Sequence, residues 1–162
     1  MSEILIAYYS HSGNTQEIAE QIEKLVGGTI FRIEPVEKYP RNYHEVLKVS
    51  KVEIENDIRP PLAEQIEEIS QYNSIFIGSP NWYSTIAPPV TTFLSENDLS
   101  GKTVIPFVTH GGGGVAHCIT DIERLVPDST VLEGFVISGS RTGNAKSKLQ
   151  EWLEKIQIPS TG

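Results

Sequence analysis

The 162 residues carry 21 acidic and 13 basic side chains, a formal charge of -8, and one cysteine, Cys118. The acidic charge, without a basic patch, argues against nucleic acid as a partner. One cysteine excludes an intramolecular disulfide and leaves too few thiolates for an iron–sulfur or structural zinc site built from this chain alone. Redox chemistry would therefore need an organic cofactor.

The length of the chain predicts its organisation. Because no long polar linker divides the 162 residues, we predict a single domain over residues 1–162. The first apolar run, residues 4–9, is too short for a signal peptide or a membrane span, and no basic region precedes it. We expect a cytoplasmic protein that does not bind membranes.

Short apolar runs alternate with amphipathic stretches along the chain, which is typical of parallel strands joined by helices. The predicted strands are residues 4–9, 29–34, 74–78, 103–109 and 131–137. Apolar spacings of three and four predict helices at residues 15–26, 89–96, 115–126 and 144–156. Within the charged, proline-bracketed segment 35–72, we predict helices at residues 43–55 and 62–70.

This order of elements predicts the fold class. Right-handed crossovers between five parallel strands favour a three-layer, doubly wound α/β fold with a five-stranded sheet of order 2-1-3-4-5. Ligands of such sheets bind at the carboxyl ends of the strands, where strands 1 and 3 diverge. The loops after strands 1, 3 and 4 are therefore the candidate site.

The loop after the first strand has the composition of a phosphate site. It consists of Ser10, His11, Ser12, Gly13, Asn14 and Thr15. Its hydroxyls, its glycine and the free amides of the following helix can surround a phosphate without a lysine. The P-loop and dinucleotide glycine patterns are both missing, which argues against NTPases and NAD-binding proteins. The alternative is that Ser, Asn and Thr here only cap the helix.

His11 allows two interpretations within this loop. Protonated, its imidazole could attract a phosphate, and binding would then weaken as pH rises. The alternative, which we favour, is a histidine that points to solvent at the loop tip.

At this point the sequence resembles the flavodoxin signature. The matching positions are Ile6, Tyr8, Ser10, Gly13, Thr15, Ala19 and Ile22. Ala7 departs from the signature, which usually has a bulkier apolar residue there. The resemblance implies a flavodoxin-like fold and an FMN cofactor, with its phosphate held by residues 10–15.

The loop after the third strand contains Pro80, Asn81, Trp82 and Tyr83. Two adjacent aromatic residues on a loop predict stacking on a flat, apolar ring, at a gain of about 1 kcal/mol beyond area burial. The alternative is that both rings pack on residues 88–89 as core or dimer surface. The stretch is similar to the flavin loop of long-chain flavodoxins, which implies that Trp82 stacks on the isoalloxazine ring and that Asn81 approaches its N5 edge.

The loop after the fourth strand begins with Thr109, His110, Gly111 and Gly112. Many flavodoxins place a second aromatic residue here, whereas glycine amides can approach the carbonyl oxygens of the flavin pyrimidine edge. One flavin face would then stay open to a substrate or a partner protein. His110 is a candidate to hydrogen-bond the flavin or supply a proton, with loop packing as an equal alternative.

Two further residues near this loop invite a metal-site interpretation, which we reject. His117 and Cys118 lie close to His110 in the sequence, but no carboxylate or second cysteine has matching spacing. We expect Cys118 to be a core residue on a helix face.

Together, the loops and the resemblance predict electron transfer through non-covalently bound FMN. None of the three loops contains Lys or Arg, which should disfavour the anionic hydroquinone and lower its potential. The acidic charge suits docking on redox partner proteins with basic surfaces.

One alternative is an FMN-dependent NAD(P)H or quinone oxidoreductase that accepts a small quinone-like substrate. A non-redox module such as a receiver domain would need acidic residues after strands 1 and 3, where this chain has Tyr9, Ser10, Ser79 and Pro80.

Overall fold

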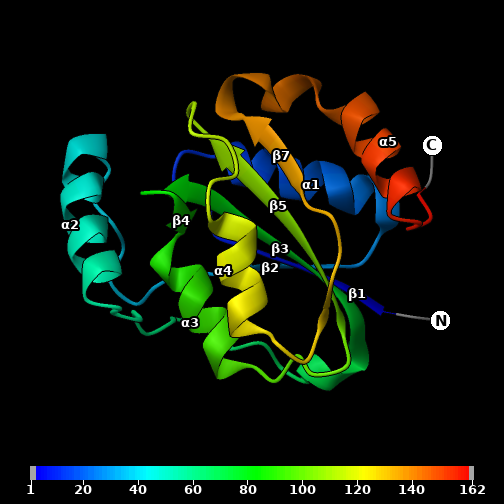
Figure 1. Cartoon of the computed structure of the whole chain (residues 1–162), viewed down its shortest axis with the longest axis horizontal. Helices are drawn as coiled ribbons and strands as arrows, with labels where there is room; N and C mark the ends of the chain where they lie inside the picture. Colours follow the sequence, from blue (N-terminus) through cyan, green and yellow to red (C-terminus); the bar gives the residue numbers. More distant parts are fainter. Residues whose placement is uncertain (1–2, 161–162) are drawn as a thin grey trace.

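The structure is a computed structural model that describes residues 3–160. A central parallel sheet has helices on both faces (Figure 1). Its strands are β1 (Glu3–Tyr8), β2 (Thr29–Arg32), β3 (Tyr72–Trp82), β4 (Thr85–Ile86), β5 (Thr103–His110), β6 (Thr130–Val131) and β7 (Phe135–Ser138). The sheet order is β2-β1-β3-β5-β6, with β7 continuing beside β5 and the short β4 antiparallel to β3. The predicted three-layer, doubly wound fold and its 2-1-3-4-5 order are confirmed.

The helices cover the two faces of this sheet as separate pairs. The helical elements are α1 (Asn14–Val26), α2 (Tyr43–Glu55), η1 (Ile69–Gln71), α3 (Pro88–Glu96), α4 (Cys118–Leu125), η2 (Gly139–Asn144) and α5 (Lys146–Lys155). Helices α1 and α5 pack on one face, and α3 and α4 pack on the other. Helix α2 stands at the outer edge of the molecule (Figure 1). No helix within residues 3–160 is long and apolar enough to cross a membrane.

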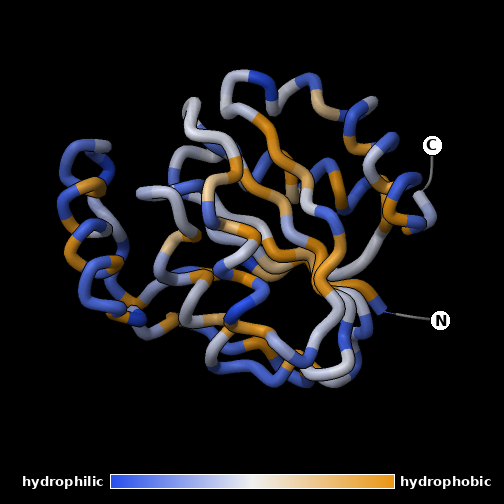
Figure 2. The backbone as a smooth tube through the Cα atoms, viewed as in Figure 1, coloured by the Kyte–Doolittle hydropathy of each residue, from blue (hydrophilic) through white to orange (hydrophobic). Residues whose placement is uncertain are grey.

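Side chains alternate between two buried clusters along each central strand, as the pleat requires. In β1, Leu5 and Ala7 join the cluster under α3 and α4, whereas Ile6 and Tyr8 join the one under α1 and α5. The central strands are accordingly the most hydrophobic part of the chain in Figure 2. Since both faces are covered, the polar loops at the strand ends are left to form a site.

The predicted fifth strand, residues 131–137, is wrong as one continuous element. It is split into β6 and β7, because from the pair Val104–Val131 to the pair Phe107–Phe135 the outer strand uses one residue more than β5. The Leu132 amide donates to the Val104 carbonyl. Pro106, two residues further along β5, faces the same outer strand but has no N–H to donate to it. The interruption lies where that donor is missing.

The predicted helix at residues 62–70 is also wrong. Only η1 at its end is helical, and before it the chain runs beside residues 34–36. The Ala63 amide donates to the Glu34 carbonyl, and the Val36 amide donates to the Pro61 carbonyl. Backbone pairing therefore replaces the helical hydrogen bonds in this segment.

Candidate functional site

A cavity of about 390 Å³ lies at the carboxyl ends of the strands, where strands 1 and 3 diverge. We call it the loop cavity. The predicted site residues in its wall are Ser12, Asn14, Pro80, Asn81, Trp82, Thr109, His110 and Gly111. Side chains from all three predicted loops therefore meet at one place, and the cavity volume lies within the range of small-molecule sites.

Four residues of the wall were not predicted from the sequence. They are Tyr43, Ser138, Gly139 and Ser140. Ser138 ends β7, and Gly139 and Ser140 follow it at the same sheet edge, so the rule that pointed to the other loops would also have indicated them. Tyr43 begins α2, within the segment that matched no motif.

The remaining predicted residues surround the cavity without lining it. Ser10 and His11 line a neighbouring cavity, Gly13 precedes α1, and Thr15 is buried beneath the loop. Tyr83 belongs to a third cavity and Gly112 is exposed on the glycine loop.

The start of α1 leaves backbone donors available at the cavity. Gly13 has a φ of 97° and caps the helix without a side-chain hydrogen bond. The first amide bonded to the cap is that of Glu17, at 3.0 Å from the Gly13 carbonyl. The amides of residues 14–16 therefore have no intrahelical acceptor, and the positive end of the helix dipole is free for an anion.

The hydroxyls of this loop divide into structural and free groups. Ser10 Oγ accepts a hydrogen bond from the Gly13 amide at 3.2 Å, and Thr15 Oγ1 bonds Thr109 Oγ1 at 2.7 Å in the buried interior. These two bonds hold the loop in shape and join α1 to β5. Ser12, by contrast, is exposed in the cavity wall.

Arg32 on β2 holds the same loop in place through hydrogen bonds. Its Nη2 donates to the Ser10 carbonyl at 2.9 Å, and its Nη1 donates to Gln16 Oε1 at 2.7 Å. Its Nε forms an ion pair with Glu34 at 2.6 Å. A cation from another strand therefore positions a loop that has none of its own.

His11 is half-buried, and the expectation that it points to solvent is wrong. Its Nε2 lies 2.8 Å from the Pro40 carbonyl, which can only accept, so Nε2 carries the proton. Its ring also lies edge-on to Trp82, with centroids 6.1 Å apart. The loop after β1 is thereby joined to the segment before α2.

Trp82 is part of the core as well as of the cavity wall. Only 4% of its surface is exposed, and it lies edge-on to Tyr39 and Tyr9 with centroids 5.1 and 5.5 Å away. This packing differs from the alternative in which the ring lies on residues 88–89. Stacking of Trp82 on a flavin stays a prediction.

Tyr83 occupies a tight two-residue turn between β3 and β4. Tyr83 and Ser84 have φ values of 53° and 70°, the left-handed region that such hairpin turns require. Tyr83 is 46% exposed, and its hydroxyl donates to the Leu47 carbonyl of α2 at 3.0 Å. The turn therefore connects the sheet to α2.

The glycine loop after β5 leaves one side of the cavity open. The Gly112 amide donates to His110 Nδ1 at 3.0 Å, so the neutral imidazole carries its proton on Nε2. Asn81 Nδ2 donates to the Gly114 carbonyl at 2.9 Å and fixes the loop's far end. Gly111 and Gly112 are exposed, with open space around their Cα atoms.

Gly139 lies close to the Asn14 side chain at the opposite wall. A Cβ on this residue would crowd Asn14 Nδ2, so the Asn14 side chain would have to shift. The absence of a side chain lets η2 pass directly beside the start of α1.

Glu53 of α2 accepts a hydrogen bond from the Tyr39 hydroxyl. Burial raises the pKa of Glu53 above its ordinary value, and the hydrogen bond from Tyr39 lowers it by less. Burial, followed by this hydrogen bond and the nearby carboxylate, also raises the pKa of Tyr39. The pair links α2 to the aromatic cluster of Tyr9, Tyr39 and Trp82.

The raised pKa of Glu53 predicts a stability that changes with pH. A carboxyl group of this kind favours the folded state below the pKa of an unfolded glutamate, and that contribution disappears as pH rises through the folded-state pKa. We expect the urea midpoint of Glu53→Gln to rise relative to the unchanged protein between about pH 4 and pH 7. A difference that is constant with pH would contradict this assignment.

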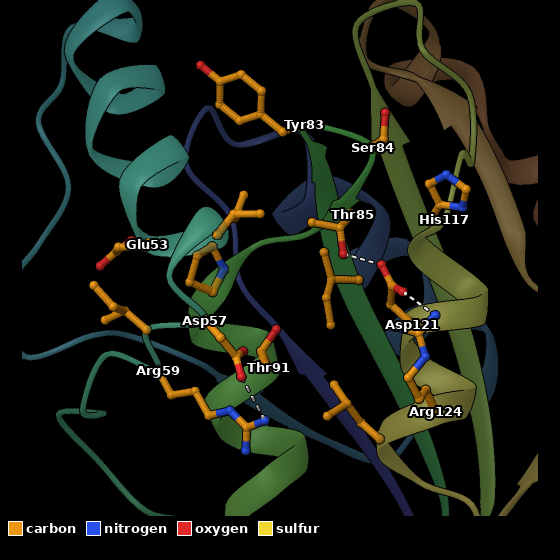
Figure 3. A pocket seen from close by; sticks show the side chains of 15 residues that line it. Glu53, Asp57, Arg59, Tyr83, Ser84, Thr85, Thr91, His117, Asp121 and Arg124 are labelled. Carbon is orange, nitrogen blue, oxygen red and sulfur yellow. Dashed lines mark hydrogen bonds and ion pairs between the residues drawn. The ribbon is translucent and has the colours of Figure 1, made fainter.

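A third cavity, of about 660 Å³, lies between α2, α3 and α4 (Figure 3). Its cations are already paired: Arg59 with Asp57 at 3.6 Å, and Arg124 with Asp121 at 3.4 Å. Asp121 also accepts a hydrogen bond from Thr85. Neither arginine of this cavity is therefore unpaired and available to a ligand.

Cys118 is fully buried at the start of α4, and its predicted place in the core is confirmed. Burial, and secondarily the nearby Asp121 carboxylate, raises the pKa of its thiol to about 12. A thiol of this pKa is protonated and unreactive at neutral pH. Within residues 3–160, no group of three or more His, Cys, Asp or Glu side chains could hold a metal ion.

This geometry defines a doubly wound α/β protein with a cavity at the switch point of its sheet, and the comparisons with known proteins agree with the fold. The sequence model of the flavodoxin family matches residues 3–156, and the chain belongs to this family. The predicted flavodoxin-like fold and family are therefore confirmed.

Solved structures and a curated relative extend this finding. A proposed flavoprotein from Bacteroides eggerthii is 30% identical, with a TM-score of 0.86 over 98% of this chain and 99% of that one. A flavoprotein from Lactobacillus acidophilus, solved in complex with FMN, has the same fold at 22% identity, with a TM-score of 0.76 over 94% of this chain and 99% of that one. An NAD(P)H dehydrogenase (quinone) from Paraburkholderia phymatum is 25% identical over 123 residues, 69% of this chain, but the match covers only 60% of its length.

Proposed function

We propose that this protein binds FMN non-covalently and transfers electrons through it. The observation that carries the proposal is the start of α1, where the amides of residues 14–16 have no intrahelical acceptor beside a cavity of suitable size. These amides, with the Ser12 hydroxyl and the Asn14 side chain, would hold the phosphate. Family membership and the FMN complex of the Lactobacillus acidophilus protein support the choice of cofactor.

The rest of the loop cavity would hold the flavin ring. Trp82 and the open glycine loop flank it, while Asn81 and the Nε2 proton of His110 are polar groups for the ring's edge. Bound FMN would supply one- and two-electron transfer, and the surrounding residues would set its potential. The lining contains no Lys or Arg in the part of the chain that the structure describes, which should destabilise the anionic reduced flavin.

The partners of an electron carrier of this kind would be redox proteins with basic docking surfaces. The formal charge of -8 supports such steering. We place the function in the cytoplasm, where the buried thiol of Cys118 would stay reduced.

A second candidate is an FMN-dependent NAD(P)H or quinone oxidoreductase. It is favoured by the exposed Gly111 and Gly112, which leave room for a small quinone-like substrate beside the ring. The name of the Paraburkholderia phymatum relative also supports it. Steady NAD(P)H oxidation by the purified protein alone would favour this enzyme over a carrier.

Titration of the flavin-free protein with FMN and riboflavin tests the phosphate site. We expect riboflavin to bind at least about tenfold more weakly, because it lacks the phosphate that the free amides of α1 would bind. Ser12→Ala should weaken FMN binding and leave riboflavin binding unchanged, as followed by flavin fluorescence. The matched control is Ser95→Ala, an exposed serine on α3.

Equal affinities for FMN and riboflavin would exclude the phosphate assignment. Failure to bind either flavin would contradict the proposed function while leaving the fold intact.

A further inference from the structure

A cavity of about 900 Å³ lies beside the loop after β1, next to the loop cavity. We call it the cationic cavity, because its charged lining consists of Arg32, Lys38 and Arg41 against Glu34. His11 also lies in its wall. A local excess of positive charge is unexpected in a chain with a formal charge of -8, and it marks this surface for an anion.

Two of these cations are available to a ligand. The guanidinium of Arg32 is engaged by Glu34, Gln16 and the Ser10 carbonyl. Lys38 and Arg41 are exposed and form no hydrogen bond or ion pair with any other residue in 3–160. The cavity of Figure 3 differs in this respect, since its two arginines are each paired with an aspartate.

The cationic cavity adjoins the loop cavity. Ser12 and Tyr43 line both, so a ligand in one lies close to a ligand in the other. Tyr43 is 59% exposed at the first position of α2 and offers an aromatic surface to a planar ring.

We propose that the cationic cavity binds the diphosphate group of a nucleotide, with Lys38 and Arg41 as its cationic contacts and Tyr43 against its base. Two unpaired cations suit a group with several negative charges, and arginine can bond phosphate oxygens in a bidentate manner. The volume is within the range of sites for ligands of this size. Binding itself requires no flavin, whereas use of such a nucleotide as an electron donor rests on the proposed function.

Calorimetric titration of the FMN-loaded protein with inorganic pyrophosphate and with ADP tests this site, because FMN then fills the phosphate loop. We expect both ligands to bind, and Lys38→Gln/Arg41→Gln to weaken both by at least about tenfold. ADP should bind more tightly than pyrophosphate, and Tyr43→Leu should remove only that difference.

The control is Arg59→Gln/Lys148→Gln, which removes the same charge from other exposed positions and should change affinity by less than about twofold. FMN affinity should be equal in the two double variants. If the two double variants lost pyrophosphate affinity equally, the loss would come from the change in net charge, and the proposed site would be overturned.

Three other outcomes would also overturn the site: no binding of pyrophosphate at millimolar concentration, no effect of Lys38→Gln/Arg41→Gln, or a parallel loss of FMN affinity in that variant. The last would mean that these cations hold the flavin phosphate itself. If no flavin binds, the proposed function fails, and the same pyrophosphate titration of the flavin-free protein still separates the two double variants.

Discussion

Replacing Trp82 with alanine should lower the free energy of unfolding by about 3–5 kcal/mol. The ring is 4% exposed and touches Tyr39 and Tyr9 edge-on, so its removal loses both buried area and two aromatic contacts. Tyr39 is tied to Glu53, which restricts its movement into the space left behind. Urea unfolding of the flavin-free protein measures the effect as a lower midpoint at unchanged slope.

The control for Trp82→Ala is Tyr43→Ala, because Tyr43 is an exposed aromatic of the same cavity wall. Its unfolding free energy should change by less than about 1 kcal/mol. A loss of that small size for Trp82→Ala would show that the aromatic cluster does not hold the loop. Trp82→Phe keeps most of the packing, so lower flavin quenching in this variant would test the stacking prediction without unfolding the protein.

The second large effect is expected at Gly78, in the middle of the sheet. An added Cβ would lie 2.3 Å from both Cε2 and Cζ of Phe107. Phe107 is fully buried and pairs with Gly78 across β3 and β5, so neither strand can move aside without breaking the sheet. We expect Gly78→Ala to cost about 3 kcal/mol or more in chemical unfolding, well above the small gain from a less flexible unfolded chain.

Gly111→Ala is the matched control, since its Cβ would meet nothing within 4 Å. Its unfolding free energy should stay within about 0.5 kcal/mol of the unchanged protein. The double substitution Gly78→Ala/Phe107→Leu should recover part of the loss by removing the crowded ring atoms. Equal stability of the two glycine variants would mean that the strand spacing at Gly78 is wider than described.

The sequence predicts those parts of the protein that depend on local patterns. The continuous apolar runs of β1, β3 and β5 identify buried parallel strands, and the rule for sheet edges brings their three loops together. The free amides predicted at the start of α1 have no side-chain cap, because the N-cap residue is Gly13.

The errors arise where distant segments decide local structure. Leu62, Ile66 and Ile69 have helical spacing, but residues 34–36 supply backbone partners that the spacing cannot reveal. The burial of Trp82 depends on Tyr39, which lies in the segment 35–72 that matched no motif. The cation that bonds the loop after β1 is Arg32 on β2, which donates to the Ser10 carbonyl. Such partners are adjacent in space only after the chain has folded.

The break in pairing between β6 and β7 decides which layer of the protein receives the side chains at the end of the sheet. Val131 packs on the side of α3 and α4, whereas Phe135 and Ile137 join the cluster of α1 and α5. Strict alternation over the four residues from Val131 to Phe135 would instead turn Phe135 and Ile137 to the side of α3 and α4. A deletion of one residue between these strands would therefore leave both core side chains on their observed side, because three steps of plain alternation from Val131 reach that face and the irregularity would no longer be needed.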